Sequence, residues 1–359
     1  MALALAACAG VAACAKPVSR QDPQAPSAAR PATHPTRWRY LATDEIGTNV
    51  VHAVADDLVT LSARGSLPKD FDPLAFCTVL VDGWGEDATT LAVGTCGGPP
   101  SPTRRWVGLQ STHLAAMEVR PGPSVGLPVE DVLVIPLPRG QAGTRAAWEG
   151  TATAVHELFH RFQASRAASV PFEMREWSGG PSAPPSSPGL GSRGYLESEY
   201  PLLPGRFDLL MAETRALLDA DAVLRSGKTA ADPAFQRAAK AFVAARNKRW
   251  KLGGVSIGDE EGWEFMEGTA VNASRRALRT LGHPDTTIVA QLASDRSLAG
   301  DATRRSYFYV HGGLQAAILD EAAGAEAWTS KAFPGQTRAG LPLFEIFQSV
   351  LQSRGDGVR

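Results

Sequence analysis

Residues 151–163 read TATAVHELFHRFQ, and this stretch decides the local fold and the chemistry that the chain can support. It contains the pattern His-Glu-x-x-His at His156, Glu157 and His160. On a helix, residues i and i+4 lie on the same face, so the two imidazoles can bind one metal ion while the glutamate reaches a water molecule on that ion. The residues of an inward face recur at spacings of three and four, at Trp148, Thr151, Val155, Leu158 and Phe162. The sequence therefore predicts a helix with two metal ligands at residues 151–167.

The ligand types indicate which metal to expect. Neutral imidazoles suit Zn²⁺, and a catalytic zinc site takes three protein ligands and leaves the fourth position to water. Zinc lowers the pKa of that water towards neutrality, and a nearby carboxylate, here Glu157, can accept its proton. We therefore expect one zinc ion per chain. The alternative is a chance match on an exposed or core helix, because short motifs carry false positives.

A third ligand is expected on another helix. The extended pattern, with a further histidine six residues after His160, is absent, because that position is Arg166 and Gln163 replaces the required glycine. The candidate is Glu267, in the sequence WEFMEGTA, since a carboxylate from a second helix completes a His, His, Glu set. Glu264 lies one turn earlier on the same face and is the candidate to orient a ligating histidine. The alternative for both glutamates is a solvated helix surface.

The composition is that of a soluble globular protein. A chain of 359 residues is long enough for a large core or two lobes. Its hydrophobic share of 44% and charged share of 20% are ordinary for such proteins. The net charge of -1 gives no electrostatic reason to expect nucleic acid as a partner.

Residues 1–14 are expected to be a secretory signal, because they are small and apolar but too few to cross a bilayer. Two stretches, ending at Cys8 and Cys14, resemble the bacterial lipobox, in which the cysteine is lipidated. Cys14 is favoured because it leaves the longer apolar segment before it. The alternatives are a plain signal peptide cleaved nearby or a disordered alanine-rich start. Residues 15–37 are rich in proline and small polar side chains and predict a disordered linker.

Residues 38–147 are expected to form an N-terminal part that contains β-strands. A helix or a strand is expected at 50–63, and strands are expected at 76–81, 90–94 and 131–136. A sheet edge beside a zinc-motif helix can pair with an extended peptide, but the sequence does not say which strand forms that edge.

Cys77 and Cys96 flank the first two of these strands. With Cys8 and Cys14 assigned to the signal, they are the remaining cysteines of the mature chain. No Cys-x-x-Cys spacing is present, and in an oxidising compartment such a pair favours a disulfide over a metal site.

Residues 148–359 are expected to form a mainly helical part. Its segment 169–205 is rich in proline, glycine and serine, and a loop of this length is either a functional lid or disordered. Beyond it, apolar periodicity and capping signals predict helices at 204–226, 232–250, 259–281, 303–323, 325–333 and 343–353.

These motifs resemble those of the gluzincin metallopeptidases. In that family a Glu-Gly-x-Ala stretch, here Glu267 to Ala270, supplies the glutamate ligand after the His-Glu-x-x-His helix. More narrowly, the chain resembles uncharacterised bacterial secreted or lipoprotein members, through IPLP at 135–138, MAETRAL at 211–217 and YVHG at 309–312. The resemblance covers about residues 132–328. The chain departs from the family in its long spacing between His160 and Glu267, and in Thr269 and Asn272.

The resemblance implies zinc binding by His156, His160 and Glu267, with Glu157 as the general base. Gluzincins also use a tyrosine or a histidine to stabilise the oxyanion of the reaction.

Tyr309 and His311 are the candidates for this role, and the alternative is that the aromatic residues here serve core packing. Glu213 would support the site from behind the ligands or serve the structure, paired with Arg215 or another arginine, and a solvated helix position is its alternative.

The sequence thus predicts an α+β, zincin-like fold with an N-terminal β-containing part and a mainly α-helical part around the metal site. The expected protein is an extracytoplasmic zinc metallopeptidase that acts on a peptide or protein and meets the membrane only through a lipid anchor. One alternative is a catalytically degenerate zinc-binding lipoprotein with a scaffold or binding role. Another is zinc-dependent hydrolysis of a substrate other than a peptide. The cleavage mode and the oligomeric state are left open.

Overall fold

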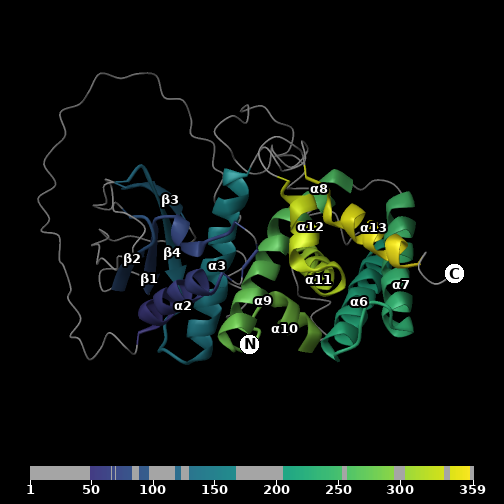
Figure 1. Cartoon of the computed structure of the whole chain (residues 1–359), viewed down its shortest axis with the longest axis horizontal. Helices are drawn as coiled ribbons and strands as arrows, with labels where there is room; N and C mark the ends of the chain where they lie inside the picture. Colours follow the sequence, from purple (N-terminus) through teal and green to yellow (C-terminus); the bar gives the residue numbers. More distant parts are fainter. Residues whose placement is uncertain are drawn as a thin grey trace, which may run out of the picture. The chain divides into compact units, whose positions relative to one another are not determined.

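The computed structural model of the chain describes residues 49–65, 67–68, 70–82, 89–96, 118–122, 129–166, 205–252, 257–294, 304–334 and 340–355 (Figure 1). The expected signal with Cys14, the linker and all but the last residue of the loop at 169–205 lie outside these residues. The described part is mixed α+β and mostly helical, with one small sheet, which confirms the expected α+β class. By its contacts the chain divides into two units, residues 1–59 with 73–150, and residues 60–72 with 151–359.

The first unit contains a four-stranded sheet of order β2-β1-β4-β3. Its strands are β1 (Thr78–Asp82), β2 (Thr89–Val93), β3 (Glu118–Pro121) and β4 (Asp131–Leu137). The central pair β1 and β4 is parallel, and each outer strand is antiparallel to its neighbour. The central strands are buried along most of their length, as their continuous apolar sequences require. Three strands lie within two residues of their predicted positions, whereas β3 has no counterpart in the prediction. Because β4 is paired on both sides, β2 and β3 form the edges of the described sheet.

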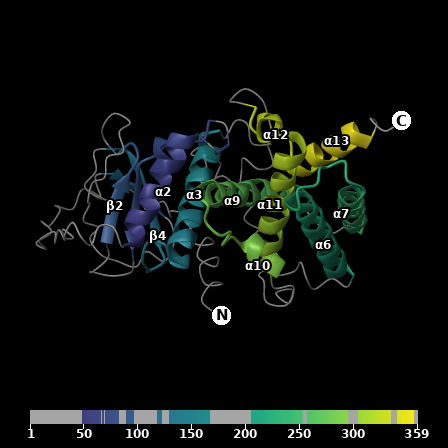
Figure 2. The same ribbon diagram turned by 60° about the horizontal axis from the view of Figure 1, so that its bottom comes forward.

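Helix α2 (Val50–Arg64) resolves the open choice between helix and strand at 50–63 in favour of a helix. It begins after Asn49, whose side-chain oxygen accepts a hydrogen bond from the backbone N–H of Val51 at 2.8 Å, as an N-cap does. Figures 1 and 2 both show α2 beside the strands. A Cβ atom at Gly150 would lie 3.0 Å from Val54 of α2 and 3.6 Å from Leu137 of β4, so the lack of a side chain lets the chain approach both elements closely here.

A short 3-10 turn, η2 (Pro73–Ala75), precedes β1. Between this turn and the strand, Cys77 forms a disulfide with Cys96, which follows β2, and their Cα atoms are 4.6 Å apart. The predicted pairing of the two cysteines is therefore present in the structure. The bond joins the start of β1 to the end of β2, which lie side by side at one end of this antiparallel pair.

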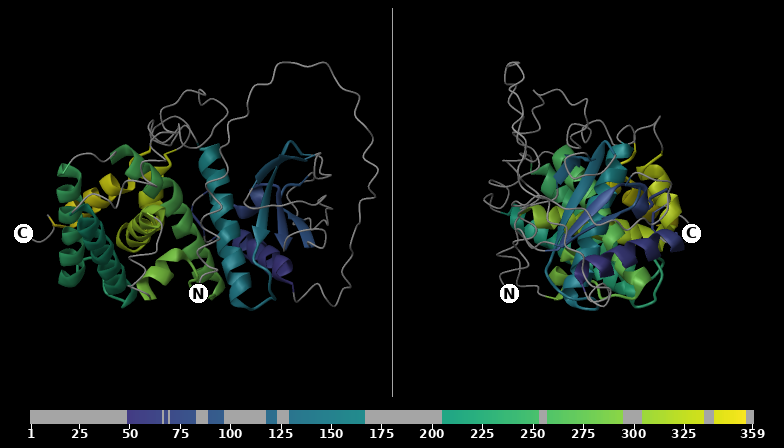
Figure 3. Two further views of the ribbon diagram at one scale, coloured as in Figure 1. Left: turned by 180° about the vertical axis from the view of Figure 1, so that it is seen from behind. Right: turned by 90° about the vertical axis from the view of Figure 1, so that its left-hand side faces the viewer.

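The second unit is a group of helices around α11 (Arg304–Ala323), as Figures 2 and 3 show. The unit further comprises the part of α3 (Arg145–Ser165) from residue 151 onward, α6 (Arg206–Arg225), α7 (Pro233–Lys251), α8 (Ile257–Trp263), α9 (Thr269–Leu281), α10 (Ile288–Ser294), α12 (Ala325–Ala332) and α13 (Leu343–Gly355). Helix α11 contacts α6, α8, α9, α10, α12 and α13. Helix α10 has no counterpart in the prediction, and α3 begins six residues before its predicted start at 151, whereas α6, α7, α11, α12 and α13 lie within two residues of their predicted ranges. None of the described helices combines the length and the apolar character that crossing a bilayer requires.

The prediction of one continuous α-helix at 259–281 is wrong in its middle. Five residues between α8 and α9 form a π-helical turn, η5 (Glu264–Gly268), which has a wider backbone than an α-helix. At this turn the backbone meets that of α11, since a Cβ atom at Gly268 would lie 2.3 Å from the Cα of Gly312. Periodicity of apolar residues does not reveal such a turn, because all residues from Gly262 to Ser274 are buried and no exposed face marks the change in helical phase.

Candidate metal centre

The three predicted ligands converge in the second unit. His156 and His160 project from α3, and Glu267 projects from the π turn η5. The two histidine Nε2 atoms are 3.0 Å apart, and the Oε2 atom of Glu267 lies 3.1 Å from the first and 3.2 Å from the second. Two imidazoles and a carboxylate thus present one ligand atom each to a common point, although the two elements that carry them are more than 100 residues apart.

The three ligand atoms fit a zinc ion. A tetrahedral zinc ion with ligands at about 2.0–2.1 Å requires neighbouring ligand atoms about 3.3 Å apart, close to the observed 3.0–3.2 Å. Among the described residues, no fourth His, Cys, Asp or Glu joins this group. The side chains of His156 and His160 retain 14% and 17% of their surface exposed, so an ion held here keeps a side open to solvent. An open fourth position is the property that separates catalytic from structural zinc sites.

Glu157 lies next to this group without belonging to it. Its side chain is 5% exposed, and its Oε2 atom has no hydrogen-bond partner among the described residues. Burial raises the pKa of Glu157, and the neighbouring His156 and His160 oppose that rise. A buried carboxylate oxygen without a hydrogen-bond partner is costly, so its presence here fits a group that takes up a proton from a water molecule at the centre.

The acidic and basic members of the group shift each other's pKa values. Burial alone would lower the pKa of His160, but the carboxylate of Glu267 outweighs burial and raises that pKa to about 9. Burial likewise opposes ionisation of Glu267, yet His160 and His156 hold its pKa well below the usual range. The carboxylate is therefore ionised, and a positive charge beside it is favourable, as it is for a bound cation.

Gln163 is a contact of the site that the sequence did not assign. Its Oε1 atom lies 2.8 Å from the Nδ1 atom of His160, on the side of the imidazole opposite the ligand atom. The signal for it was available, since residues i and i+3 are neighbours on a helix face and Gln163 stands three residues after His160.

The structure separates the two candidates for oxyanion stabilisation. The ring of Tyr309 lies parallel to the imidazole of His156, with ring centroids 6.1 Å apart and an interplanar angle of 3°. His311 is completely buried, and its Nε2 and Nδ1 atoms lie 2.7 Å from Thr214 Oγ1 and 3.3 Å from an Arg246 nitrogen. Both of its ring nitrogens are thus used inside the protein. The geometry places Tyr309 beside the metal centre and favours it over His311.

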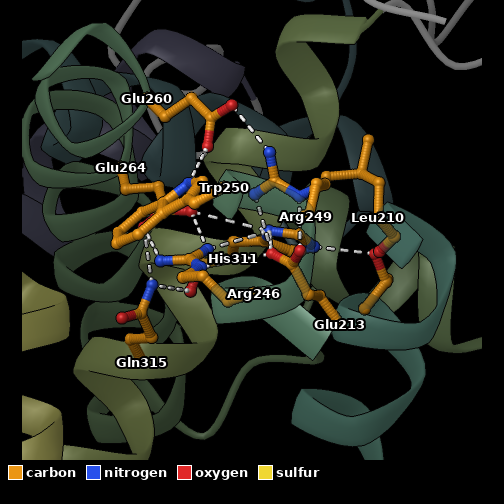
Figure 4. A network of polar contacts seen from close by, with 10 residues as sticks. Leu210, Glu213, Arg246, Arg249, Trp250, Glu260, Glu264, His311 and Gln315 are labelled. Atoms are coloured by element: carbon orange, nitrogen blue, oxygen red, sulfur yellow. Dashed lines mark hydrogen bonds and ion pairs between the residues drawn. The ribbon is translucent and has the colours of Figure 1, made fainter. Parts of the chain in front are cut away.

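His311 belongs to a buried ionic network, which Figure 4 shows, between α6, α7, α8, η5 and α11. Arg246 binds Glu264 through both terminal nitrogens, one at 2.7 Å, and donates from Nε to Glu213 at 3.2 Å. Arg249 binds Glu213 and, at 2.7 Å, Glu260. The network places three carboxylates around two guanidinium groups, all of them at most 1% exposed.

Glu264 and Glu213, the two glutamates predicted to support the site, lie in this network. Both are buried, so the alternative of a solvated position is wrong for each of them. Arg246 holds the pKa of Glu264 at about 2 against the effect of burial. Burial and then the nearby carboxylates raise the pKa of Glu213 to about 8, although Arg246 opposes this. Glu264 contacts Arg246, Gln315 and His311, and none of these is a candidate metal ligand.

Acid is expected to destabilise the protein through His311. Burial lowers the pKa of His311 from 6.5 to about 4, although Glu264 opposes this. Between these values the unfolded chain binds a proton at His311 that the folded chain does not bind, so the stabilising effect is complete above pH 6.5 and is lost as pH falls towards 4. Its size is about 3 kcal/mol.

The measurement is the free energy of unfolding by urea, in the presence of a chelator, for the wild type and for His311→Gln between pH 7.5 and 4.5. We expect the advantage of the wild type over the variant to shrink steadily below pH 6.5. An advantage that does not depend on pH would contradict the buried, neutral state of His311.

Comparisons of the chain with models of protein families, with curated proteins and with solved structures found no match in any of the three.

Proposed function

We propose that this chain is a zinc metallopeptidase with a zincin-like arrangement of the gluzincin type. The observation that carries the proposal is the convergence of the ligand atoms of His156, His160 and Glu267 within 3.2 Å of one another, with the buried carboxylate of Glu157, whose Oε2 has no hydrogen-bond partner among the described residues, beside them. A zinc ion bound there would supply a water molecule of lowered pKa and a Lewis acid for a carbonyl group.

Each side chain then has a definite task. His156, His160 and Glu267 would hold the ion, and Glu157 would accept the proton of the attacking water and pass it to the departing amine. Tyr309, stacked beside His156, is the candidate donor to the oxygen atom on which negative charge develops. Glu157 and the open side of the group argue for catalysis, because a purely structural zinc site needs no base and closes its fourth position with a protein ligand.

The substrate class and the location are part of the same proposal. The substrate is a peptide or a protein, bound as an extended segment, and the enzyme acts outside the cytoplasm. A lipid at Cys14, in the sequence before the described residues, would anchor it to a bacterial membrane. No nucleic acid is expected as a partner.

The proposal predicts that zinc binding and hydrolysis separate in two variants. The wild type is expected to hold one zinc ion per chain by elemental analysis and to hydrolyse peptides. Glu267→Ala is expected to lose zinc, since it removes one of three ligands. Glu157→Gln is expected to keep zinc and to lose activity by a factor of about 10²–10⁴, the usual contribution of a general base.

A wild type without zinc, even after supplementation, would contradict the whole proposal. A wild type that holds zinc but hydrolyses no peptide would point to the scaffold role or to another substrate. A panel of ester, amide and phosphoester substrates, with Glu157→Gln as the control, separates these two outcomes.

A further inference from the structure

The amide of Gln163 is completely buried between α3 and the π turn η5. Its oxygen lies 2.8 Å from the Nδ1 atom of His160, and its nitrogen donates to the backbone oxygen of Met266 at 2.9 Å and to Thr269 Oγ1 at 2.8 Å. The carbonyl of Met266 can only accept, so the nitrogen of the amide faces the π turn and the oxygen faces the histidine.

This orientation of the amide determines the tautomer of His160. An amide oxygen accepts hydrogen bonds and does not donate them, so the proton of a neutral His160 must reside on Nδ1. The Nε2 atom then carries the lone pair, and this is the atom 3.2 Å from Glu267 and 3.0 Å from His156. A neutral imidazole binds a metal ion only through a nitrogen with a free lone pair, and its other nitrogen sets which one that is.

The same amide also holds the π turn. Met266 directly precedes Glu267, and the wider π turn alters the backbone hydrogen bonds around these residues. Gln163 satisfies the carbonyl of Met266, and Thr269, which accepts from Gln163, donates in turn to the carbonyl of Phe265 at 2.6 Å. One side chain of the histidine helix is thereby tied to both ends of the segment that presents Glu267.

We propose that Gln163 is a positioning residue that fixes the tautomer of His160 and sets the distance between the two elements that carry the metal ligands. This inference rests on the proposed zinc centre and assigns the residue that preorganises it. Gln163 touches neither the ion nor the substrate, and it acts through His160 and through the backbone beside Glu267.

The test compares the full-length wild type with Gln163→Met, Gln163→Glu and Thr269→Val. Methionine keeps the length of the side chain and removes all of its hydrogen bonds, glutamate keeps only an acceptor, and valine at 269 removes one acceptor of the amide nitrogen and leaves the bond to His160. Zinc affinity is measured by competition with a chromogenic chelator, and the tautomer of His160 by NMR of the zinc-free protein labelled with ¹⁵N-histidine, at a pH at which the imidazole is neutral, because a zinc ion on Nε2 would by itself leave the proton on Nδ1. Neither readout depends on catalytic activity.

We expect Gln163→Met to weaken zinc binding by about 10–100-fold, the usual effect of removing an outer contact of a ligand, and to lose the single Nδ1–H signature of His160. Gln163→Glu is expected to keep that signature, and Thr269→Val to keep it with a smaller loss of affinity. If Gln163→Met does not fold, the other two variants carry the test.

A Gln163→Met variant with unchanged zinc affinity and tautomer would overturn this inference while leaving the zinc centre intact. The same holds for a Gln163→Glu variant that loses the Nδ1–H signature. A wild type that binds no zinc would instead overturn the proposed function, so the two failures are distinguishable.

Discussion

Replacement of Gly312 by alanine is expected to destabilise the second unit by about 3 kcal/mol or more. A Cβ atom at this position would lie 2.0 Å from the backbone oxygen of Glu264 and 2.7 Å from its carbonyl carbon. Both of these atoms belong to the backbone of Glu264 in η5, which packs tightly against α11, so no rotamer change can relieve the contact. The π turn η5 must then move away from α11, and it carries Glu267 with it. We therefore expect weaker zinc binding as well as lower stability.

The matched control is Gly313→Ala. Its Cβ atom would lie 2.9 Å from a side-chain methyl of Val271 and 3.4 Å from one of Val289, which can shift more easily than a backbone. A cost of about 1 kcal/mol is expected, with zinc affinity unchanged. Urea unfolding and chelator competition on both variants make the comparison. Equal effects at the two glycines would mean that the close approach of η5 to α11 does not position the ligand.

The convergence of the three candidate metal ligands was the most predictable part of this protein. The i, i+4 spacing of His156 and His160 requires only a helix, and that helix is present. Glu267 could be selected because a carboxylate amid Trp263, Phe265 and Met266 indicates a buried helix face, and the structure places it within 3.2 Å of both histidines. Local spacing and side-chain chemistry are enough for these assignments.

The surroundings of the ligands were less predictable because tertiary contacts create them. Arg246 and Arg249 belong to α7, a helix rich in lysine and arginine. Such residues are usually exposed to solvent, yet these two are completely buried. Their burial depends on acidic partners from other helices, Glu213, Glu260 and Glu264, which one sequence cannot pair with them. The π turn escaped prediction for the same reason, since it depends on the contact of its backbone with α11.

Arg246→Met is expected to destabilise the protein by about 3–5 kcal/mol, the cost of removing one partner from a buried ion pair. The change leaves the carboxylate of Glu264, which is 1% exposed, with Gln315 at 2.8 Å and His311 at 3.5 Å as its remaining partners and with no positively charged partner among the described residues. An ionised carboxylate in such surroundings must take up a proton or draw water into the core. Because Glu264 is the first residue of the π turn that carries Glu267, zinc affinity is expected to fall together with stability.

Two further variants identify the cause of that loss. Arg279→Met removes an exposed arginine whose partner Glu321 is also exposed (67% and 50%), and such a pair is worth at most about 1 kcal/mol. The double variant Arg246→Met, Glu264→Gln removes the unpaired charge and is expected to recover part of the stability. The guanidinium of Arg246 also lies over the rings of Phe242 and Phe344, at 4.6 and 4.9 Å. If the double variant is no more stable than Arg246→Met, the loss comes from these ring contacts rather than from the unpaired carboxylate, and the ion pair is not what holds the π turn in place.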